Sequence, residues 1–364
     1  MNARPYAMDA SSEGMDVEAC MALLHDRNYQ VAELELYYAE LEAKSGLALP
    51  NVRELLNRVL FVNRGERHIA LRRAALAFFR TPIVAAWRPV IAALAEQAVE
   101  RLEGRSEADL VADFARPLAA EIVCRIMGLP TARWDDYERW TGEALWVMEP
   151  FLPLRRLPPV EAALEQFASE VRAALAGPAI QEGDGRRSFL HFPIDGLEGE
   201  ERVWLAISLY GASNVTRHTL ANTILHLSRV APPFRAILAD PAARTEAVER
   251  LIAAGASFVT VTRYRAEEGG IERRIEVPVA AASRAALGGR CPVAEAQNGP
   301  PVEHVAFGAG VHRCVGAFLA RIVIAEALTA LVRRYPAFSI ARQPSGFIRS
   351  ALVTSPLDLP CTLD

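Results

Sequence analysis

One stretch decides the fold of this chain: it reads FGAGVHRCVG and runs from Phe307 to Gly316. It presents a single cysteine, Cys314, from a glycine-rich loop just before a run, Ala317–Leu328, whose apolar residues recur at helical spacing. Glycine lets the backbone turn sharply and approach a flat ligand without a side-chain clash. Amide donors and the positive end of the following helix dipole stabilise a thiolate in this position. A sulfur presented in this way is suited to ligate a metal.

The same stretch resembles the cysteine-ligand loop of the cytochrome P450 family, F-G-x-G-x-H-x-C-x-G, at all six defined positions. The resemblance implies a mainly α, cytochrome P450-like fold with small peripheral β-sheets, and haem b (iron protoporphyrin IX) as the cofactor. It implies that Cys314 is the metal ligand and that Phe307, Gly308, His312 and Gly316 contact the haem. A buried structural thiol after a glycine turn is the simpler alternative, but six matches in fixed register disfavour it.

Size and composition allow a large globular protein. The chain has 364 residues, 51% of them hydrophobic, which is enough for one large core or two smaller ones. No linker is long enough to separate independent domains, so we expect one cytochrome P450-like haem domain over residues 1–364. Its N-terminal region is shorter than the resemblance leads us to expect, because only 67 residues precede His68.

Charge and cysteine content exclude several classes of function. The net charge is −4 and no basic block is present, which argues against nucleic acid or a membrane surface as a partner. No apolar run approaches the length of a membrane span, and the N-terminus lacks the layout of a signal peptide, so we expect a cytoplasmic protein. The five cysteines are odd in number and irregularly spaced, which fits a reducing compartment. His312 and Cys314 form the only close His/Cys pair, and two ligands do not make a zinc site.

Hydrophobic spacing predicts a mainly α chain. The predicted helical stretches are Val17–Leu41, Ile69–Leu102, Leu110–Met127, Val160–Leu175, Val203–Val230 and Ala243–Ala254. Alternating or β-branched residues predict short strands near Phe258–Thr262, Ile275–Val279 and Ala337–Val353.

Four charged or imidazole side chains are candidate partners of the two haem propionates, which need them because an unpaired buried carboxylate is costly. His68 and Arg72 are four residues apart, so they lie on one helical face, and they resemble the H-x-x-x-R helix of the family. Arg263 aligns with the strand arginine that has the same role in the family, and His312 lies beside the ligand loop. Each of the four, taken alone, is better explained as a solvated surface charge. Together with the cysteine loop, we favour cofactor contact for His68, Arg72 and His312, whereas both explanations fit Arg263 equally.

The stretch Leu205–Ser228 resembles the helix that crosses the distal haem face in the family, where the pattern is A-G-x-[DE]-T. This chain has GASNV instead, so that Asn214 stands in place of the acid and Val215 in place of the threonine. The small residues are retained, and Ala212 among them leaves room for a ligand above the iron.

The two replacements remove the proton-delivery groups that the usual reaction needs, namely a titratable acid and an alcohol that orders water. Asn214 can donate a hydrogen bond but cannot ionise, and Val215 can do neither. Thr216 lies about 100° further around the helix unless a bulge re-aims it, and Ser213 has the same difficulty. Asn214, Thr216 and Ser213 are therefore the candidate catalytic residues.

A second departure concerns the E-x-x-R pair, which in relatives is a buried ion pair completed by an arginine from the loop before the ligand cysteine. Near Glu249, Arg250 and Ala253 occupy the positions of the pair, and no arginine lies between Cys291 and Phe307. Removing one partner of a buried pair costs about 3–5 kcal/mol, whereas replacing the whole set can be nearly neutral. Because all three members are missing together, we expect a repacked but folded protein.

Three functions remain open. The first is a haem-thiolate enzyme that performs an oxidative or atypical haem-dependent tailoring step on a small molecule, in secondary-metabolite biosynthesis, without the standard relay. It could use hydrogen peroxide, its substrate could supply the missing acid or hydroxyl, or it could perform a non-oxygenating step at a nitrogen or oxygen atom of the substrate. The second is an ordinary dioxygen-dependent monooxygenase with a ferredoxin-type redox partner, in which Thr216, Ser213 and ordered water replace the relay. The third is a non-catalytic haem or recruitment module of the same fold. The intact cysteine loop favours an enzyme, and the lost relay favours the first function.

Overall fold

The computed structural model describes residues 6–8, 14–149, 152–179, 181–182, 186–266, 272–293, 296, 299–350 and 352–363. The chain divides into two compact units. The first unit comprises Met1–Gln30, Arg88–Ala119 and Val215–Asp364, and the second comprises Val31–Trp87 and Ala120–Asn214. The expectation of a single domain is not tested by this division and stays a prediction.

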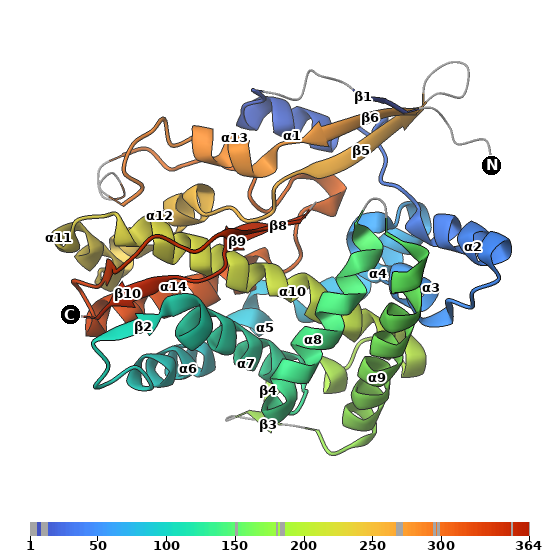
Figure 1. The fold of residues 1–364 in the computed structure, drawn as a ribbon, viewed down its shortest axis with the longest axis horizontal. Helices are drawn as coiled ribbons and strands as arrows, with labels where there is room; N and C mark the ends of the chain where they lie inside the picture. Colours follow the sequence, from blue (N-terminus) through green and yellow to red (C-terminus); the bar gives the residue numbers. More distant parts are fainter. Residues whose placement is uncertain are drawn as a thin grey trace. The chain divides into compact units, whose positions relative to one another are not determined.

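Helices dominate the described residues, as the sequence predicts (Figure 1). The first unit contains α1 (Val17–His25), α6 (Arg88–Glu100), α11 (Pro232–Arg235), α12 (Pro241–Ala254), α13 (Val279–Ala285) and α14 (Ala317–Arg334). The second unit contains α2 (Leu34–Ser45), α3 (Pro50–Leu56), α4 (Gly65–Phe78), α5 (Thr81–Ala85), α8 (Trp134–Ala144) and α9 (Leu157–Ala176). Two helices, α7 (Arg116–Met127) and α10 (Gly199–Ser228), contribute residues to both units.

The strands are short and form small sheets, which confirms the expected peripheral β-structure. One sheet has the order β1 (Tyr6–Met8), β6 (Glu272–Val277), β5 (Val261–Ala266), with β1 parallel and β5 antiparallel to β6. A second has the order β2 (Glu107–Asp109), β10 (Pro360–Thr362), β7 (Ser339–Ile340). Two antiparallel pairs join β3 (Gln181–Glu182) to β4 (Arg186–Arg187) and β8 (Phe347–Arg349) to β9 (Thr354–Pro356).

Two of the predicted helical stretches are wrong as single helices. In Val17–Leu41 the chain turns after α1, because the side chain of Asp26 accepts a hydrogen bond from the Asn28 amide at 2.9 Å. In Ile69–Leu102 the break comes before Pro82, which lies in the first turn of α5 and cannot continue the preceding helix. Side-chain hydrogen bonds and proline therefore override an apolar period that continues across the break.

In the first unit, α14 packs along α6. The buried apolar residues of α14 recur at helical spacing and include Ile322, Ile324, Leu328 and Leu331. Burial of each such aliphatic side chain contributes about 1.5–3 kcal/mol to the free energy of folding. Ion pairs add less: Arg88 of α6 pairs with Glu326 of α14 at 3.0 Å, and Arg334 of α14 pairs at 3.1 Å with Glu103, in the turn that follows α6. This packing anchors the helix that begins just after Cys314.

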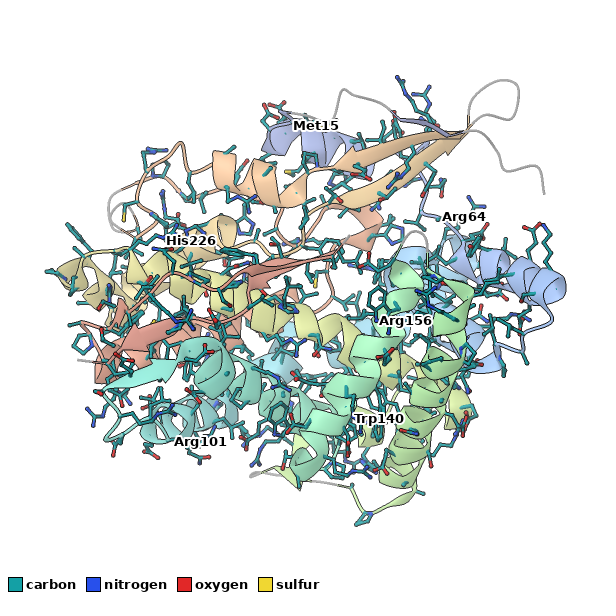
Figure 2. The ribbon with its side chains drawn as sticks, in the orientation of Figure 1. Met15, Arg64, Arg101, Trp140, Arg156 and His226 are labelled. Carbon is teal, nitrogen blue, oxygen red and sulfur yellow. The ribbon has the colours of Figure 1, made fainter. Side chains whose placement is uncertain are left out.

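In the second unit, aromatic rings join α8 and α9 to the first half of α10. Tyr137 stacks on Phe167 with ring centroids 5.4 Å apart, and Phe167 meets Tyr210 edge-on at 5.3 Å. Trp140 of α8 belongs to the same cluster (Figure 2). The geometry is that of favourable aromatic pairs, so this layer fixes the first half of α10 within its unit.

None of the described helices is by itself both long and apolar enough to cross a membrane. The segments Gly65–Phe78 and Thr81–Glu100, which are bent relative to each other, reach that length and apolar content only when they are counted as one.

Arg235 ties together backbone segments of the first unit. Its side chain donates to the carbonyl oxygens of Val230 at 2.7 Å, Phe338 at 2.7 Å and Ser228 at 2.9 Å, and its guanidinium carbon lies 4.5 Å from the Phe338 ring centroid. Burial lowers the pKa of this guanidinium. The residue itself is 2% exposed. Its charge is therefore stabilised by carbonyl dipoles, including that of the last residue of α10.

We predict that Arg235→Met lowers the free energy of unfolding by about 3 kcal/mol, because it leaves several buried carbonyl oxygens without a donor. Urea unfolding at neutral pH measures the change. The control is Arg333→Met, whose side chain is 63% exposed and pairs with Glu96 at the surface, and for which less than about 1 kcal/mol is expected. Equal destabilisation by the two variants would contradict the prediction.

Candidate functional site

Cys314 lies in a tight turn that ends just before the N-cap of α14, Gly316. The backbone N–H of Cys314 donates to the carbonyl oxygen of Phe307 at 2.9 Å, which closes the turn. Gly308 and Gly310 have φ angles of +65° and +67°, a region that L side chains rarely enter. Cys314 is exposed, so its sulfur is accessible beside a helix N-terminus, where the dipole favours a thiolate.

Gly310 meets a second requirement that Gly308 does not. A Cβ atom at Gly310 would lie 2.2 Å from the carbonyl oxygen of Leu24, near the end of α1. A Cβ atom at Gly308 would have nothing within 4 Å. The cysteine turn therefore passes directly against the backbone of α1 at Gly310.

An ionic cluster joins α12 and α14 to the cysteine turn. Glu249 of α12 accepts two hydrogen bonds from Arg321 of α14, from Nε at 2.5 Å and from Nη2 at 2.8 Å. His304 Nε2 lies 3.0 Å from the second carboxylate oxygen of Glu249. The guanidinium carbon of Arg321 lies 4.5 Å from the ring centroid of Phe307, within the range of a cation–π contact. Three separate segments therefore meet at one carboxylate.

The electrostatics of this cluster favour an ionised Glu249. The Nδ1 atom of His304 accepts a hydrogen bond from the Ala306 amide at 3.2 Å, so Nε2 carries the proton and donates to Glu249. Burial alone would raise the pKa of Glu249, but the hydrogen bonds from His304 and Arg321 outweigh it and lower the pKa from 4.5 to about 2. The stability that this carboxylate contributes is thus complete above pH 4.5 and is lost as the pH falls through 2.

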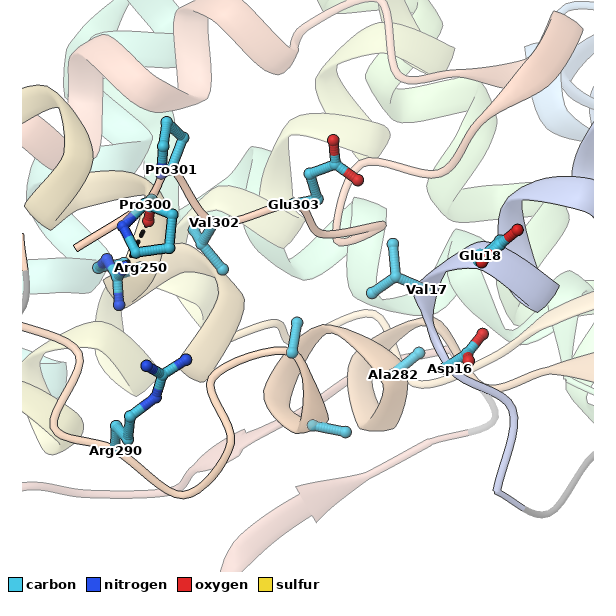
Figure 3. A pocket seen from close by; sticks show the side chains of 12 residues that line it. Asp16, Val17, Glu18, Arg250, Ala282, Arg290, Pro300, Pro301, Val302 and Glu303 are labelled. Atoms are coloured by element: carbon cyan, nitrogen blue, oxygen red, sulfur yellow. Dashed lines mark hydrogen bonds between the residues drawn. The ribbon is translucent and has the colours of Figure 1, made fainter.

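Arg250, the next residue of α12, holds the segment that leads to the cysteine turn. Its side chain is 3% exposed; Nε donates to Glu246 at 2.8 Å, and Nη2 donates to the carbonyl oxygen of Pro300 at 2.7 Å (Figure 3). Glu246 also accepts the backbone N–H of Val302 at 2.9 Å. Glu246, Glu249 and Arg250 therefore all bind residues between 300 and 304.

A cavity of about 410 Å³ borders this segment, between α12, α13 and the start of α1. Arg250 and Arg290 lie at one end of it, and the carboxylates of Glu18 and Glu303 lie toward the other (Figure 3). None of the residues predicted to contact a cofactor lines this cavity.

The sequence pattern predicts that the ion-pair network of the E-x-x-R helix is lost, but the structure shows another set of charged residues paired in the same region. Arg250 and Ala253 are the residues predicted to occupy the E-x-x-R positions, whereas the neighbouring Glu249 pairs with Arg321 from a different helix. The prediction of a folded, repacked arrangement did not identify these partners. The available signal was that Arg321 is an ionisable residue with apolar neighbours on both sides in its helical stretch, which requires a partner for its charge.

Arg263 lies on β5, opposite Ile275 of β6. It is 5% exposed, and burial lowers the pKa of its guanidinium to about 10. Its Nη1 donates to the carbonyl oxygen of Thr262 at 3.0 Å, and no carboxylate of the described residues pairs with it. A buried cation in this state is suited to a carboxylate supplied by a ligand.

His68 and Arg72 lie one turn apart on α4 in the second unit. His68 is 4% exposed, which excludes the alternative of a solvated surface group for this residue. Burial, and then the charge of Arg72, lower the pKa of the imidazole. The neighbouring Arg67 and Arg73 are exposed, so they do not share the buried face of the helix that carries His68.

The stretch around Asn214 is part of an unbroken α-helix, α10, with no bulge. Thr216 is therefore not re-aimed and keeps its offset of about 100° from the position of Val215. The hydroxyl of Ser213 donates to the carbonyl oxygen of Tyr210, one turn back in the same helix. Ala212 is exposed in the middle of this helix.

The second half of α10 carries a buried polar cluster that the sequence analysis missed. His218 Nδ1 lies 2.7 Å from the hydroxyl of Ser355, and the hydroxyls of Thr219 and Ser257 lie 2.7 Å apart. Burial lowers the pKa of His218 to about 3, so this imidazole is neutral. The signal that could have revealed the cluster is the run of polar residues at 218, 219 and 222 in an apolar helix.

The structure places the predicted site residues in two groups. The first unit contains Cys314, Phe307, Gly308, His312, Gly316, Arg263 and Thr216. The second unit contains His68, Arg72, Ala212, Ser213 and Asn214. Contact of both groups with one cofactor stays a prediction.

The residues of the first unit fit a haem. An accessible thiol at a helix N-terminus can add one ligand to a metal that a macrocycle already holds. No group of three or more His, Cys, Asp or Glu side chains in the described part of the chain could hold a metal by itself. The buried Arg263 in turn suits a carboxylate such as a haem propionate.

Comparison with known proteins identifies related sequences and folds. No protein-family model matches the chain. The mycinamicin IV hydroxylase/epoxidase of Micromonospora griseorubida is 30% identical over 320 residues, which cover 80% of this chain and 77% of that protein. Cytochrome P450 107B1 of Saccharopolyspora erythraea is 27% identical, with coverage of 76% and 70%. The nocardicin C N-oxygenase of Nocardia uniformis subsp. tsuyamanensis is 29% identical, with coverage of 81% and 77%.

Solved structures share the fold. CalO2 matches with a TM-score of 0.80 at 21% identity, covering 96% of this chain and 89% of that one. P450BioI, solved in complex with an acyl carrier protein ligated to hexadec-9Z-enoic acid, matches with a TM-score of 0.78 at 20% identity and coverage of 96% and 91%.

We predict that Gly310→Ala destabilises the chain more than Gly308→Ala. Both substitutions place alanine at a positive φ, which costs about 1 kcal/mol, but only the first brings a Cβ atom against the Leu24 carbonyl. We expect a further loss of about 1–3 kcal/mol for Gly310→Ala, measured by urea unfolding of the haem-free chain. Equal losses for the two variants would show that the contact with α1 is not formed.

Proposed function

The chain belongs to the cytochrome P450 family, and from this premise we propose that it transforms a small molecule of secondary metabolism at its haem without the acid–threonine relay. Its class is that of the haem-thiolate oxidoreductases, and its cofactor is haem b. Relatives that carry out secondary-metabolite tailoring, such as mycinamicin IV hydroxylase/epoxidase and nocardicin C N-oxygenase, support the substrate class.

The observation that carries this proposal is the regularity of α10. Because the helix has no bulge, Thr216 is not turned into the position of Val215. Because the hydroxyl of Ser213 donates to Tyr210, its proton is committed to the helix backbone. Asn214 can orient a bound molecule by hydrogen bonding but cannot release a proton at neutral pH. Neither hydroxyl is therefore placed as a direct substitute for the missing acid and alcohol.

The remaining residues have roles in binding. Cys314 is proposed as the thiolate ligand, and Arg263, His312, His68 and Arg72 as partners of the haem propionates. When bound, haem supplies an iron at which an oxidant or a heteroatom of the substrate can be activated. The protein contributes the thiolate, the apolar surroundings and the orientation of the substrate. Hydrogen peroxide is the proposed oxidant because it brings the protons that the helix does not deliver.

A second candidate is a dioxygen-dependent monooxygenase with a ferredoxin-type partner. It is favoured by the names of relatives, which include 6-deoxyerythronolide B hydroxylase and luteothin monooxygenase. In this case Thr216, Ser213 and ordered water would deliver protons. The non-catalytic alternative is not supported, because the curated relatives are named as enzymes.

We predict that Cys314→Ala abolishes the thiolate-type band in the spectrum of the reduced carbonyl complex, because it removes the sulfur that the glycine-rich turn presents at the start of α14. Haem content and the reduced-carbonyl spectrum are the measurements. Cys291→Ala, which changes another exposed cysteine, is the matched control and should leave both unchanged. Unaltered pigment in Cys314→Ala would refute the assignment of the ligand.

We predict that Asn214→Asp with Val215→Thr raises turnover driven by reduced ferredoxin and dioxygen by about tenfold or more, because it restores an acid and an alcohol. A panel of polyketide and peptide intermediates is first screened with the wild-type protein, and the compounds that shift its Soret band are used as substrates. Thr216→Val is the control, and its turnover with hydrogen peroxide should equal that of the wild-type protein. Incorporation of oxygen from labelled dioxygen by the wild type, together with its loss in Thr216→Val, would support the second candidate instead.

A further inference from the structure

The ionic cluster around Glu249 is connected to Cys314 by a short series of contacts. Glu249 holds the guanidinium of Arg321 through two parallel hydrogen bonds. That guanidinium lies over the ring of Phe307, at 4.5 Å from its centroid. The carbonyl oxygen of Phe307 accepts the backbone N–H of Cys314 at 2.9 Å. Only two residues, Arg321 and Phe307, therefore lie between the Glu249 carboxylate and the amide of Cys314 in this series of contacts.

The same carboxylate also fixes the entry to the turn. His304 donates to Glu249 from Nε2 and accepts the Ala306 amide at Nδ1, so its imidazole is held at both nitrogens. The ring of His304 lies 6.0 Å from that of Phe307. The side chain of His304 is 4% exposed and that of Glu249 is 19% exposed, so water competes weakly for these bonds.

We propose that Glu249 is a positioning residue for the thiolate: through Arg321 and His304 it fixes Phe307, and thereby the turn that presents Cys314. This inference rests on the proposed function, in which Cys314 is the haem ligand. Arg321 supplies what the arrangement needs, because a planar guanidinium can form the two-bond fork with a carboxylate and stack on an aromatic ring at the same time. Neither Glu249 nor Arg321 contacts the reacting atoms in this role.

The neighbouring contacts of α12 provide an internal control. Glu246, one turn before Glu249, binds the Val302 amide and Arg250. Arg250 in turn binds the Pro300 carbonyl (Figure 3). These contacts hold the same loop at an earlier point and make no contact with Phe307. A general loosening of the loop and a specific loss of the Phe307 contact should therefore affect different amides.

The test compares Glu249→Gln with Glu246→Gln in the full chain. We expect Glu249→Gln to increase hydrogen exchange of the amides from 305 to 314 by about tenfold or more, because it removes charge-assisted hydrogen bonds at the origin of the series. In the haem-loaded protein it should shift the reduced-carbonyl spectrum away from the thiolate-type band. Glu246→Gln should increase exchange near Val302 and leave the Cys314 amide and the spectrum unchanged.

A second variant covers the case in which Glu249→Gln does not fold. Arg321→Lys keeps the positive charge opposite Glu249 but cannot form the planar fork or the same ring contact. We expect it to fold and still to raise exchange of the Cys314 amide and to weaken the thiolate-type band. If Lys behaves as Arg does in both measurements, the pair has only a structural role and the proposal is overturned.

The outcomes separate this inference from the function on which it rests. A wild-type protein without haem or without a thiolate-type band refutes the proposed function, whatever the variants do. A wild type with that band, together with Glu249→Gln that matches it in exchange and spectrum, refutes only the positioning role.

Discussion

The hydrogen bond from the Cys314 amide to the Phe307 carbonyl is the constraint on which the site depends. It closes a turn that contains two glycines at positive φ, one of which passes against the backbone of α1. The turn ends at the start of α14, whose apolar stripe is packed along α6. The position of one sulfur is thus tied to the core of the first unit by the geometry of the backbone.

Charged side chains of α12 hold the approach to this turn. Glu246, Glu249 and Arg250 bind successive points of the segment from Pro300 to His304, and Arg321 returns the contact from α14. Such groups are expensive to bury unless each is paired and hydrogen-bonded, and here they are. This arrangement explains how the chain can depart from the E-x-x-R pattern and still present a family-type cysteine loop.

The two halves of α10 differ in a way that bears on chemistry. The first half carries Asn214 and a Ser213 hydroxyl that is bonded to the helix backbone. The second half carries a neutral, buried His218 and a pair of hydroxyls, Thr219 and Ser257, that are bonded to each other. The polar groups of this helix are therefore mostly engaged within the protein. A reaction that brings its own protons is compatible with such a helix.

The sequence by itself determined the fold class and predicted the ligand turn and the replacement of the acid–threonine pair, because these follow from local patterns: fixed glycine and cysteine spacing, and a helical period of apolar residues. It also placed His68 and Arg72 on one face of a helix. It failed where distant segments meet. The pairing of Glu249 with Arg321 joins residues 72 positions apart, and the breaks within Val17–Leu41 and Ile69–Leu102 depend on side-chain hydrogen bonding and proline. Only the tertiary structure decided those contacts, since charge pairing depends on which helices pack together and not on spacing along the chain.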